Sequence, residues 1–345
     1  MLQRNAAVSI FLVVIMMIAA HPAGALDPIP NQAGFSGFIR PGGGYLDIES
    51  NMVAEFASFE LSDDPISSRF DSPDGESTGI FLLPFNVAFT LNNLKTQVFL
   101  GTQLTDLARF DLTQQLGIKQ EIGGLGILQV GFLRSGIATE VWEDPYVENL
   151  ERSTTDRDIS GAQLAWGNIF GSDLELTYTF RSIDIDDERS GVFLGLTPAQ
   201  RSLLERDGDQ HSIEVLYLFK LEGDHRLAPS FRFLVDDRDG DARANDQYTF
   251  KLSYSYMGDP FTVISNVSIG KADYDKTNPI YGKKQEDDLF GAGLTVLYTN
   301  PWGWSLWDSR PIRFYVEGGY YERDADIDFY EEQVVSATAG VFIRW

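Results

Sequence analysis

Cysteine is absent from the 345-residue chain, so no disulfide contributes to its stability. Residues 26–345 also lack an apolar run of the ~20 residues that a spanning helix needs, so a membrane-embedded chain would have to cross as strands. Basic residues are few, with 27 Lys and Arg against 51 Asp and Glu. Without a basic stripe to neutralise phosphates, we expect no nucleic-acid partner.

The first 25 residues have the composition of a cleaved signal peptide. Arg4 supplies the positive start, residues 6–20 are apolar, and Ala23-Gly24-Ala25 is an A-x-A cleavage site. Export through the Sec pathway would then leave residues 26–345 as the mature chain. No Pro-, Gly- or Ser-rich linker divides these residues, so we expect one domain. A secreted chain of this size without disulfides is stabilised by a large core or by a sheet closed in lipid.

Apolar residues recur at every second position through most of the mature chain. Residues 174–181 place Leu174, Leu176, Tyr178 and Phe180 on one face, and Glu175, Thr177, Thr179 and Arg181 on the other. The same alternation runs through 81–91, 210–219, 248–256 and 290–298. A soluble β-sandwich alternates too, but its strands average about 5 to 6 residues. Runs of about ten residues instead predict tilted strands that cross a membrane.

Short and long connections alternate between these strands. The short ones are rich in Gly, Asn and Asp, and lie at 92–93, 121–125, 167–171, 222–225 and 258–260. The long ones lie at about 60–78, 102–110, 136–156, 184–209, 236–245, 272–286 and 322–331. This pattern predicts an all-β, antiparallel up-and-down transmembrane barrel with short periplasmic turns and long acidic extracellular loops. Counting back from Trp345 gives about 14 strands if residues 35–59 form one strand interrupted near Pro41; 12 or 16 strands remain open.

The C-terminal stretch VVSATAGVFIRW places Val335, Val341 and Ile343 on an apolar face that no later residue covers. Lipid would cover it in the outer membrane of a Gram-negative bacterium. A last strand that ends on Trp345 resembles the terminal signature of outer-membrane proteins, which implies recognition by the barrel-assembly machinery. The long connection TNPWGWSLWDSRP carries Trp302, Trp304 and Trp307, which we interpret as headgroup anchors rather than as an interaction site.

Seven stretches of the mature chain resemble one known family. They are QAGFSGFI (32–39), IESNM (48–52), DSPDGEST (71–78), TEVWEDPYV (139–147), RSIDIDDERSG (181–191), NPIYGKKQEDD (278–288) and IDFYEEQV (327–334). Together they are similar to the domain of unknown function 2860 family, a group of predicted Gram-negative outer-membrane barrels. The resemblance implies fold and location, and it brings no established activity and no functional residue.

The inward-facing positions of the predicted barrel carry many charges. Those we expect to line a pore are Lys119, Glu175, Arg181, Glu214, Arg226, Arg232, Lys251, Arg313 and Glu317. Unpaired ions in a dry interior cost several kcal/mol each, whereas a wet lumen avoids that cost. About fourteen strands leave room for water. We therefore expect a porin-like outer-membrane channel for small hydrophilic solutes, with a closed structural or ligand- or cation-binding barrel as the alternative.

An enzyme is the least favoured reading. Only His211 and His225 remain after signal cleavage, and His225 lies in a tight turn. Asp209 and His211, with Asp184 nearby, loosely resemble the Asp and His arrangement of omptin proteases. The alternation, however, places His211 on the lipid-facing side with Ile213. We expect no catalytic residue and no cofactor.

The predicted outer loops are strongly acidic, as in DIDDER (184–189), DDRDGD (236–241) and ERDADID (322–328). Residues 237–248 begin like an EF-hand loop, but Ala242 replaces the required Gly and Tyr248 the bidentate acid, so no calcium site is predicted there. We expect solvated loops that repel one another; cations bridging them to anionic lipopolysaccharide are a second possibility. Residues 197–208 have helical spacing and either enter the lumen or lie over its mouth. Ion selectivity, solute and oligomeric state stay undecided.

Overall fold

The computed structural model describes residues 26–56, 59–61, 65–91, 95–103, 113–136, 138–300, 302–306 and 310–345. The expected signal peptide, the turn at 92–93, most of the 102–110 loop and Trp307 lie outside these residues. Among the described residues, no helix is long and apolar enough to cross a membrane.

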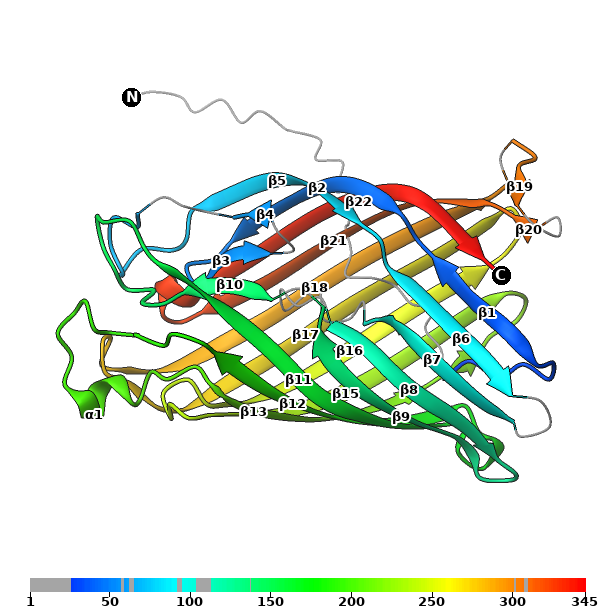
Figure 1. The fold of residues 1–345 in the computed structure, drawn as a ribbon, viewed down its shortest axis with the longest axis horizontal. Helices are drawn as coiled ribbons and strands as arrows, with labels where there is room; N and C mark the ends of the chain where they lie inside the picture. Colours follow the sequence, from blue (N-terminus) through cyan, green and yellow to red (C-terminus); the bar gives the residue numbers. More distant parts are fainter. Residues whose placement is uncertain are drawn as a thin grey trace, which may run out of the picture.

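Fourteen antiparallel wall strands form a closed barrel (Figure 1), as the sequence predicts. In chain order they are β1 with β2 (Gly34–Ile39, Gly42–Glu49), β5 with β6 (Gly75–Leu82, Phe85–Leu91), β7 (Thr96–Thr102), β8 (Thr113–Ile122), β9 (Gly126–Ser135), β11 (Thr154–Gly167), β12 (Leu174–Ile185), β13 with β14 (Gly208–Tyr217, Phe219–Lys220), β15 (His225–Arg238), β16 (Asn245–Met257), β17 (Phe261–Asn278), β18 (Lys283–Thr299), β21 (Arg313–Ala325) and β22 (Glu332–Arg344).

The last strand closes the barrel against the first. β22 pairs with β21 on one side and with β2 and β1 on the other. The backbone of Trp345 exchanges hydrogen bonds of 3.0 and 3.1 Å with Gly37, which extends this seam to the C-terminus. Glycine is needed beside the seam, because a Cβ at Gly44 would collide with the carbonyl oxygen of Ala337.

The first wall strand is interrupted at Arg40 and Pro41, where the proline has no N–H to give the ladder. It ends at Glu49, so the single strand expected over 35–59 is too long. The chain instead turns back into β3 (Val53–Phe56), which pairs with β10 (Thr139–Trp142) and, by its other edge, with β4 (Phe59–Glu60). Apolar side chains of β3 pack against those of β2, in a small core with Leu46 and Ile48.

The alternation predicted from the sequence is seen on the wall. Outward side chains are apolar and exposed, among them Leu116 (55%), Phe132 (55%), Phe250 (45%) and Val316 (63%). Inward neighbours such as Gln115, Ser253 and Thr338 are polar and buried. Soluble monomers rarely expose a continuous apolar belt of this extent, so this surface suits lipid.

The two ends of the barrel differ, as predicted. At one end, here called the turn end, short connections join the strands at 123–125, 168–173, 221–224 and 258–260; the longer connection 300–312 contains β19 (Ser305–Leu306) and β20 (Arg310–Pro311). The other end, the loop end, holds the described parts of 50–74 (50–56, 59–61 and 65–74) together with 143–153, 186–207, 239–244, 279–282 and 326–331. The last three of these connections are shorter than expected, because β15, β17, β18 and β21 extend into segments that the sequence reading assigned to loops.

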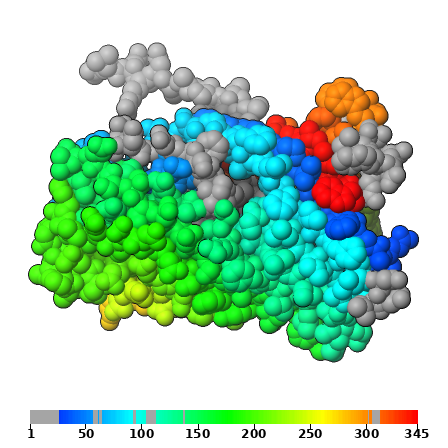
Figure 2. All heavy atoms as spheres, in the orientation of Figure 1, coloured from blue at the N-terminus to red at the C-terminus, as the bar shows by residue number. Residues whose placement is uncertain are grey.

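The connections at the loop end are packed together. Residues 186–207 contain α1 (Pro198–Arg201), and Figure 2 shows this green part of the chain at the same end as the other loops. Tyr146, Leu204 and Phe329, from three different connections, are fully buried in one cluster, which we call the loop core. Ile327 and Tyr330 complete its centre. The connections at the loop end thus pack through apolar residues, while acidic side chains such as Asp239 and Asp328 are exposed, as expected of solvated loops. That the loops repel one another stays a prediction.

Candidate functional site: the barrel lumen

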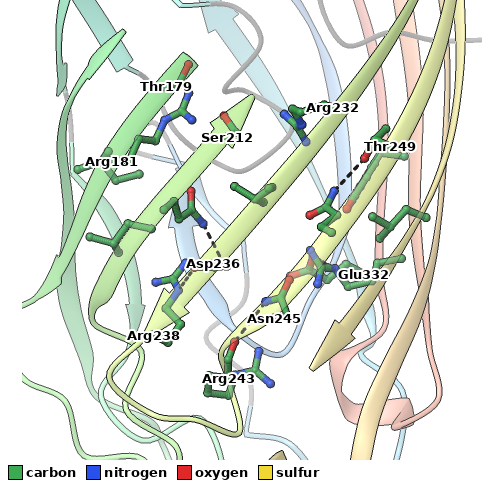
Figure 3. Close-up of a pocket in the computed structure, with 18 of the residues that line it drawn as sticks. Thr179, Arg181, Ser212, Arg232, Asp236, Arg238, Arg243, Asn245, Thr249 and Glu332 are labelled. Atoms are coloured by element: carbon green, nitrogen blue, oxygen red, sulfur yellow. Dashed lines mark hydrogen bonds and ion pairs between the residues drawn. The ribbon is translucent and has the colours of Figure 1, made fainter. Parts of the chain in front are cut away.

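A cavity of about 380 Å³ lies inside the barrel, in the half nearer the loop end. One continuous part of its wall comes from the inward faces of β11, β12, β13, β15 and β16 (Figure 3). Eight cationic side chains line it, namely Arg157, Arg181, Arg206, Arg232, Arg238, Arg243, Lys251 and Arg323. Three acidic side chains do so, namely Glu214, Asp236 and Glu332.

A lower group of charges lies toward the turn end of the cavity. Glu214 and Arg232 are register partners on β13 and β15. The Lys251 ammonium on β16 lies 3.5 Å from a Glu214 carboxylate oxygen. Arg181 on β12 is buried and belongs to the same cavity wall. These four residues lie on adjacent strands. Their side chains all face the lumen because inward positions alternate with lipid-facing ones along each strand.

An upper group lies beneath the loops and is held by ion pairs. The Arg206 Nε donates to Glu188 at 2.6 Å, and its Nη2 donates to the carbonyl of Trp142 at 2.7 Å. Arg238 makes a two-point contact with Asp236, at 2.5 and 3.2 Å. Two planar donors on one carboxylate fix the orientation of the guanidinium as well as its position.

Arg243 is positioned differently, by aromatic rings and an amide. Its guanidinium lies 4.1 Å from the ring centre of Tyr330 and 5.3 Å from that of Tyr274, and it donates to Gln285 at 3.0 Å. Gln285 in turn donates to Asp287 at 2.8 Å. The electron-rich ring faces attract the cation, so Arg243 keeps its position at the cavity without a carboxylate in direct contact among the described residues.

An apolar band separates the two charged groups. Ile159 on β11 and Ile183 on β12 are register partners, and both are buried at the cavity wall. On β15, Leu234 lies between Arg232 and Asp236 at successive inward positions. Val53 of β3 and Val141 of β10 add to the apolar lining. The lumen thus presents cationic, apolar and again cationic side chains along its length.

The structure separates the nine residues expected to line a pore into two sets. Arg181, Glu214, Arg232 and Lys251 lie on the cavity wall. The other five, Lys119, Glu175, Arg226, Arg313 and Glu317, lie on wall strands nearer the turn end and away from this cavity. That any of the nine lines a conducting path stays a prediction.

Two of the five residues near the turn end have defined partners. Glu317 forms an ion pair with Arg40, which also lies 4.1 Å from the ring centre of Tyr315. Glu175 accepts a hydrogen bond of 2.5 Å from the backbone N–H of Leu26. The start of the described chain therefore reaches the inward side of β12.

Five cationic residues of the cavity wall were not predicted from the sequence, namely Arg157, Arg206, Arg238, Arg243 and Arg323. The last four lie in segments that were assigned to acidic loops from the sequence and were therefore not expected to face inward. Continued alternation through Arg232, Leu234, Asp236 and Arg238 was the available signal that β15 extends past the expected loop boundary.

The loop core closes over the cavity from the loop end. The hydroxyls of Tyr146 and Tyr330 are 2.6 Å apart, and Asn278 donates to Tyr330 at 2.8 Å. Burial raises the pKa of Tyr146 well above its ordinary value of 10, so this phenol stays neutral and hydrogen-bonded. With Leu204 fully buried here, residues 197–208 lie over the mouth rather than inside the lumen.

A hydrolase site at His211 and a metal site among the acidic loops were also considered from the sequence. His211 lies on the outer face of β13, and its Nδ1 is 2.8 Å from the hydroxyl of Tyr178, which is also outward. Within the described parts of the chain, no three His, Asp or Glu side chains are grouped so as to hold a metal ion.

Residues 34–343 match the sequence profile of the family described as protein of unknown function DUF2860. The chain belongs to the DUF2860 family. No curated protein matches it. Three of the stretches that resemble the DUF2860 family meet in the loop core, through Tyr146, Tyr281 and Tyr330.

Solved outer-membrane barrels are similar to this DUF2860 protein over most of their length. OmpT of Vibrio cholerae is 12% identical, with a TM-score of 0.41, over 90% of this chain and 98% of its own. The outer membrane channel DcaP of Acinetobacter baumannii is 12% identical, with a TM-score of 0.42, over 94% and 99%. A Pseudomonas aeruginosa FadL homologue is 9% identical, with a TM-score of 0.42, over 96% and 98%. Likeness at this level carries no functional inference.

Proposed function

We propose that this protein is an outer-membrane channel that passes small hydrophilic solutes through its lumen. The observation that carries the proposal is the charged cavity inside a closed barrel with an apolar outer belt. Eleven ionisable side chains around about 380 Å³ would cost several kcal/mol for each unpaired charge if the cavity were dry. Water in the lumen removes this cost, and a water-filled lumen inside a lipid-facing barrel is a path across the membrane.

The surroundings of the barrel belong to the same proposal. Lipid and lipopolysaccharide contact the outer face, and the barrel-assembly machinery binds the C-terminal strand that ends at Trp345. Trp302 and Trp304, exposed beside Phe314 at the turn end, lie at headgroup level. A catalytic role for His211 is not proposed, because its side chain lies outside the lumen.

Planar-bilayer recording of the purified mature protein tests the channel. Insertion should give stepwise current increases that do not occur with heat-denatured protein. The matched control is the Phe250→Ala variant, which changes only the outer face and should conduct like the wild type. A persistently flat trace, from protein shown to be inserted, would contradict the proposal.

A closed barrel is the second candidate, and the loop core favours it. Five connections at the loop end supply side chains to one apolar cluster over the cavity, which is the arrangement of a lid. The two candidates differ in one measurement, because a permanently closed barrel stays silent whereas a gated channel conducts when the loop core is loosened. The Phe329→Ala variant, which loosens the loop core, makes that comparison.

A further inference from the structure

The charge of the lumen is opposite in sign to that of the whole protein. Eight cationic and three acidic side chains line the cavity, and two further carboxylates, Glu188 and Asp287, pair with lining arginines. Even when both are included, cations exceed acids by three among these described side chains. The complete chain carries a net charge of −24. The net charge of the whole chain would favour the passage of cations. A passing solute, however, meets the side chains of the lumen, and the described lumen charges favour anions.

The barrel wall strengthens this local excess. Low-dielectric walls focus the field of the charges inside a cleft, so ions of the opposite sign concentrate there. Arginine supplies most of the cations, and its planar donors match the two oxygens of a carboxylate. Figure 3 shows Arg181, Arg232, Arg238 and Arg243 around the same space, so a bound anion would have several donors within reach.

The apolar band indicates which class of anion the lumen would bind. Arg181 pairs in register with Gly161, and Ile185 pairs with Arg157 four residues nearer the loop end. At about 3.3 Å per residue, the two cationic levels are about 13 Å apart along the strand. Ile159 and Ile183 lie between them. An inorganic ion would gain nothing from this band, whereas the carbon body of an organic acid would pack against it.

We propose that the lumen selects small organic anions, with carboxylates on the arginines and their apolar bodies against Ile159, Ile183 and Leu234. This inference rests on the proposed channel function for transport, but it also predicts binding in the lumen, which does not require conduction.

Two measurements on the detergent-purified full-length mature protein test the proposal. The first is the reversal potential in a planar bilayer under a KCl gradient, which reports chloride against potassium permeability. The second is isothermal titration with sodium benzoate, sodium phosphate and choline chloride. The double variant Arg181→Gln/Arg232→Gln removes two lumen charges. Lys271→Gln is the matched control, because Lys271 lies on the outer face of β17 and is paired with Asp288.

Wild type should prefer chloride and bind benzoate more tightly than phosphate, with no choline binding. A charge about 8 Å from an ion in water changes the local concentration of chloride about twofold, and that of potassium about twofold in the opposite sense. Removing two charges should therefore lower the chloride-to-potassium permeability ratio about sixteenfold. It should also weaken benzoate binding, while Lys271→Gln changes neither property. If the double variant does not fold, Gln247→Lys adds a lumen charge and should raise the chloride-to-potassium permeability ratio about fourfold.

The outcomes separate the inference from the channel function. Conductance with cation preference and no benzoate binding keeps the channel and overturns the inference. Benzoate binding that depends on Arg181 and Arg232, in a protein that never conducts, keeps the inference and overturns the channel. Phosphate binding as tight as benzoate binding overturns the organic part of the assignment.

Discussion

Phe329 offers a direct test of the loop core as the lid of the lumen. Its side chain is fully buried, and its ring centre lies 5.2 Å from that of Tyr146, 5.2 Å from that of Tyr330 and 6.2 Å from that of Tyr281. These partners come from three connections. Phe329→Ala therefore removes a ring that contacts aromatic residues of all three.

The expected magnitude follows from this burial. Truncating a buried Phe to Ala costs about 3–5 kcal/mol. We expect the loop core to bear most of this cost, because the wall strands are held by their own ladders of hydrogen bonds. At about 1.4 kcal/mol for each factor of ten, the population of opened loops should rise by at least about a hundredfold. The barrel itself should remain folded.

Limited proteolysis and single-channel recording measure the two consequences. Phe329→Ala should be cleaved faster within residues 186–207 and 279–282 and should show larger or more frequent openings than the wild type. Phe231→Ala is the control, because Phe231 lies on the outer face of β15. Wild-type protease resistance together with unchanged conductance in Phe329→Ala would refute the role of the loop core as a lid.

Three further predictions concern the same end of the barrel. Burial, and then repulsion from Asp239, raises the pKa of Glu205 above 4.5, so its stabilising contribution is complete below pH 4.5 and is lost as pH rises through the raised value. Glu205→Gln should therefore reduce amide exchange in residues 202–207 at pH 7. It should also make the protection of these amides, relative to an unfolded chain, depend less on pH; unchanged protection would contradict this. Arg206→Ala leaves the partly buried Glu188 carboxylate without its cationic partner and should destabilise the loop by up to about 3 kcal/mol. The double change with Glu188→Ala should restore part of this, as measured by hydrogen exchange. His211→Ala should leave conductance unchanged. Loss of a hydrolytic activity in this variant would instead support the hypothesis of a hydrolase that uses His211.

The barrel was predictable from the sequence because one physical rule acts on every wall strand. Lipid on one side and the lumen on the other force a period of two. The sequence alone therefore assigns Thr249 to the inward face and Phe250 to the outward face, without information about neighbouring strands. Gly-, Asn- and Asp-rich turns then indicate about 14 strands, although the Gly-rich start left 12 and 16 open. The position of Arg181 and Lys251 inside the barrel follows from the same rule.

The loop core was not predictable in this way. Tyr146, Leu204 and Phe329 are far apart in the chain and are surrounded by acidic residues, so no local period marks them as buried. Their packing depends on the closed barrel, which brings the ends of distant strands together. The upper arginines were missed for a related reason, because composition placed the end of β15 before Arg238 when the ladder with β13 continues to it.

The absence of cysteine permits a direct test of the central claim, that one face of each strand meets water and the other meets lipid. Thr249 and Phe250 are neighbours on β16, with inward and outward side chains respectively. In outer-membrane preparations, a small water-soluble thiol reagent should label the Thr249→Cys variant rapidly and leave the Phe250→Cys variant unlabelled. Equal labelling of both positions, or labelling of Phe250→Cys alone, would contradict the account.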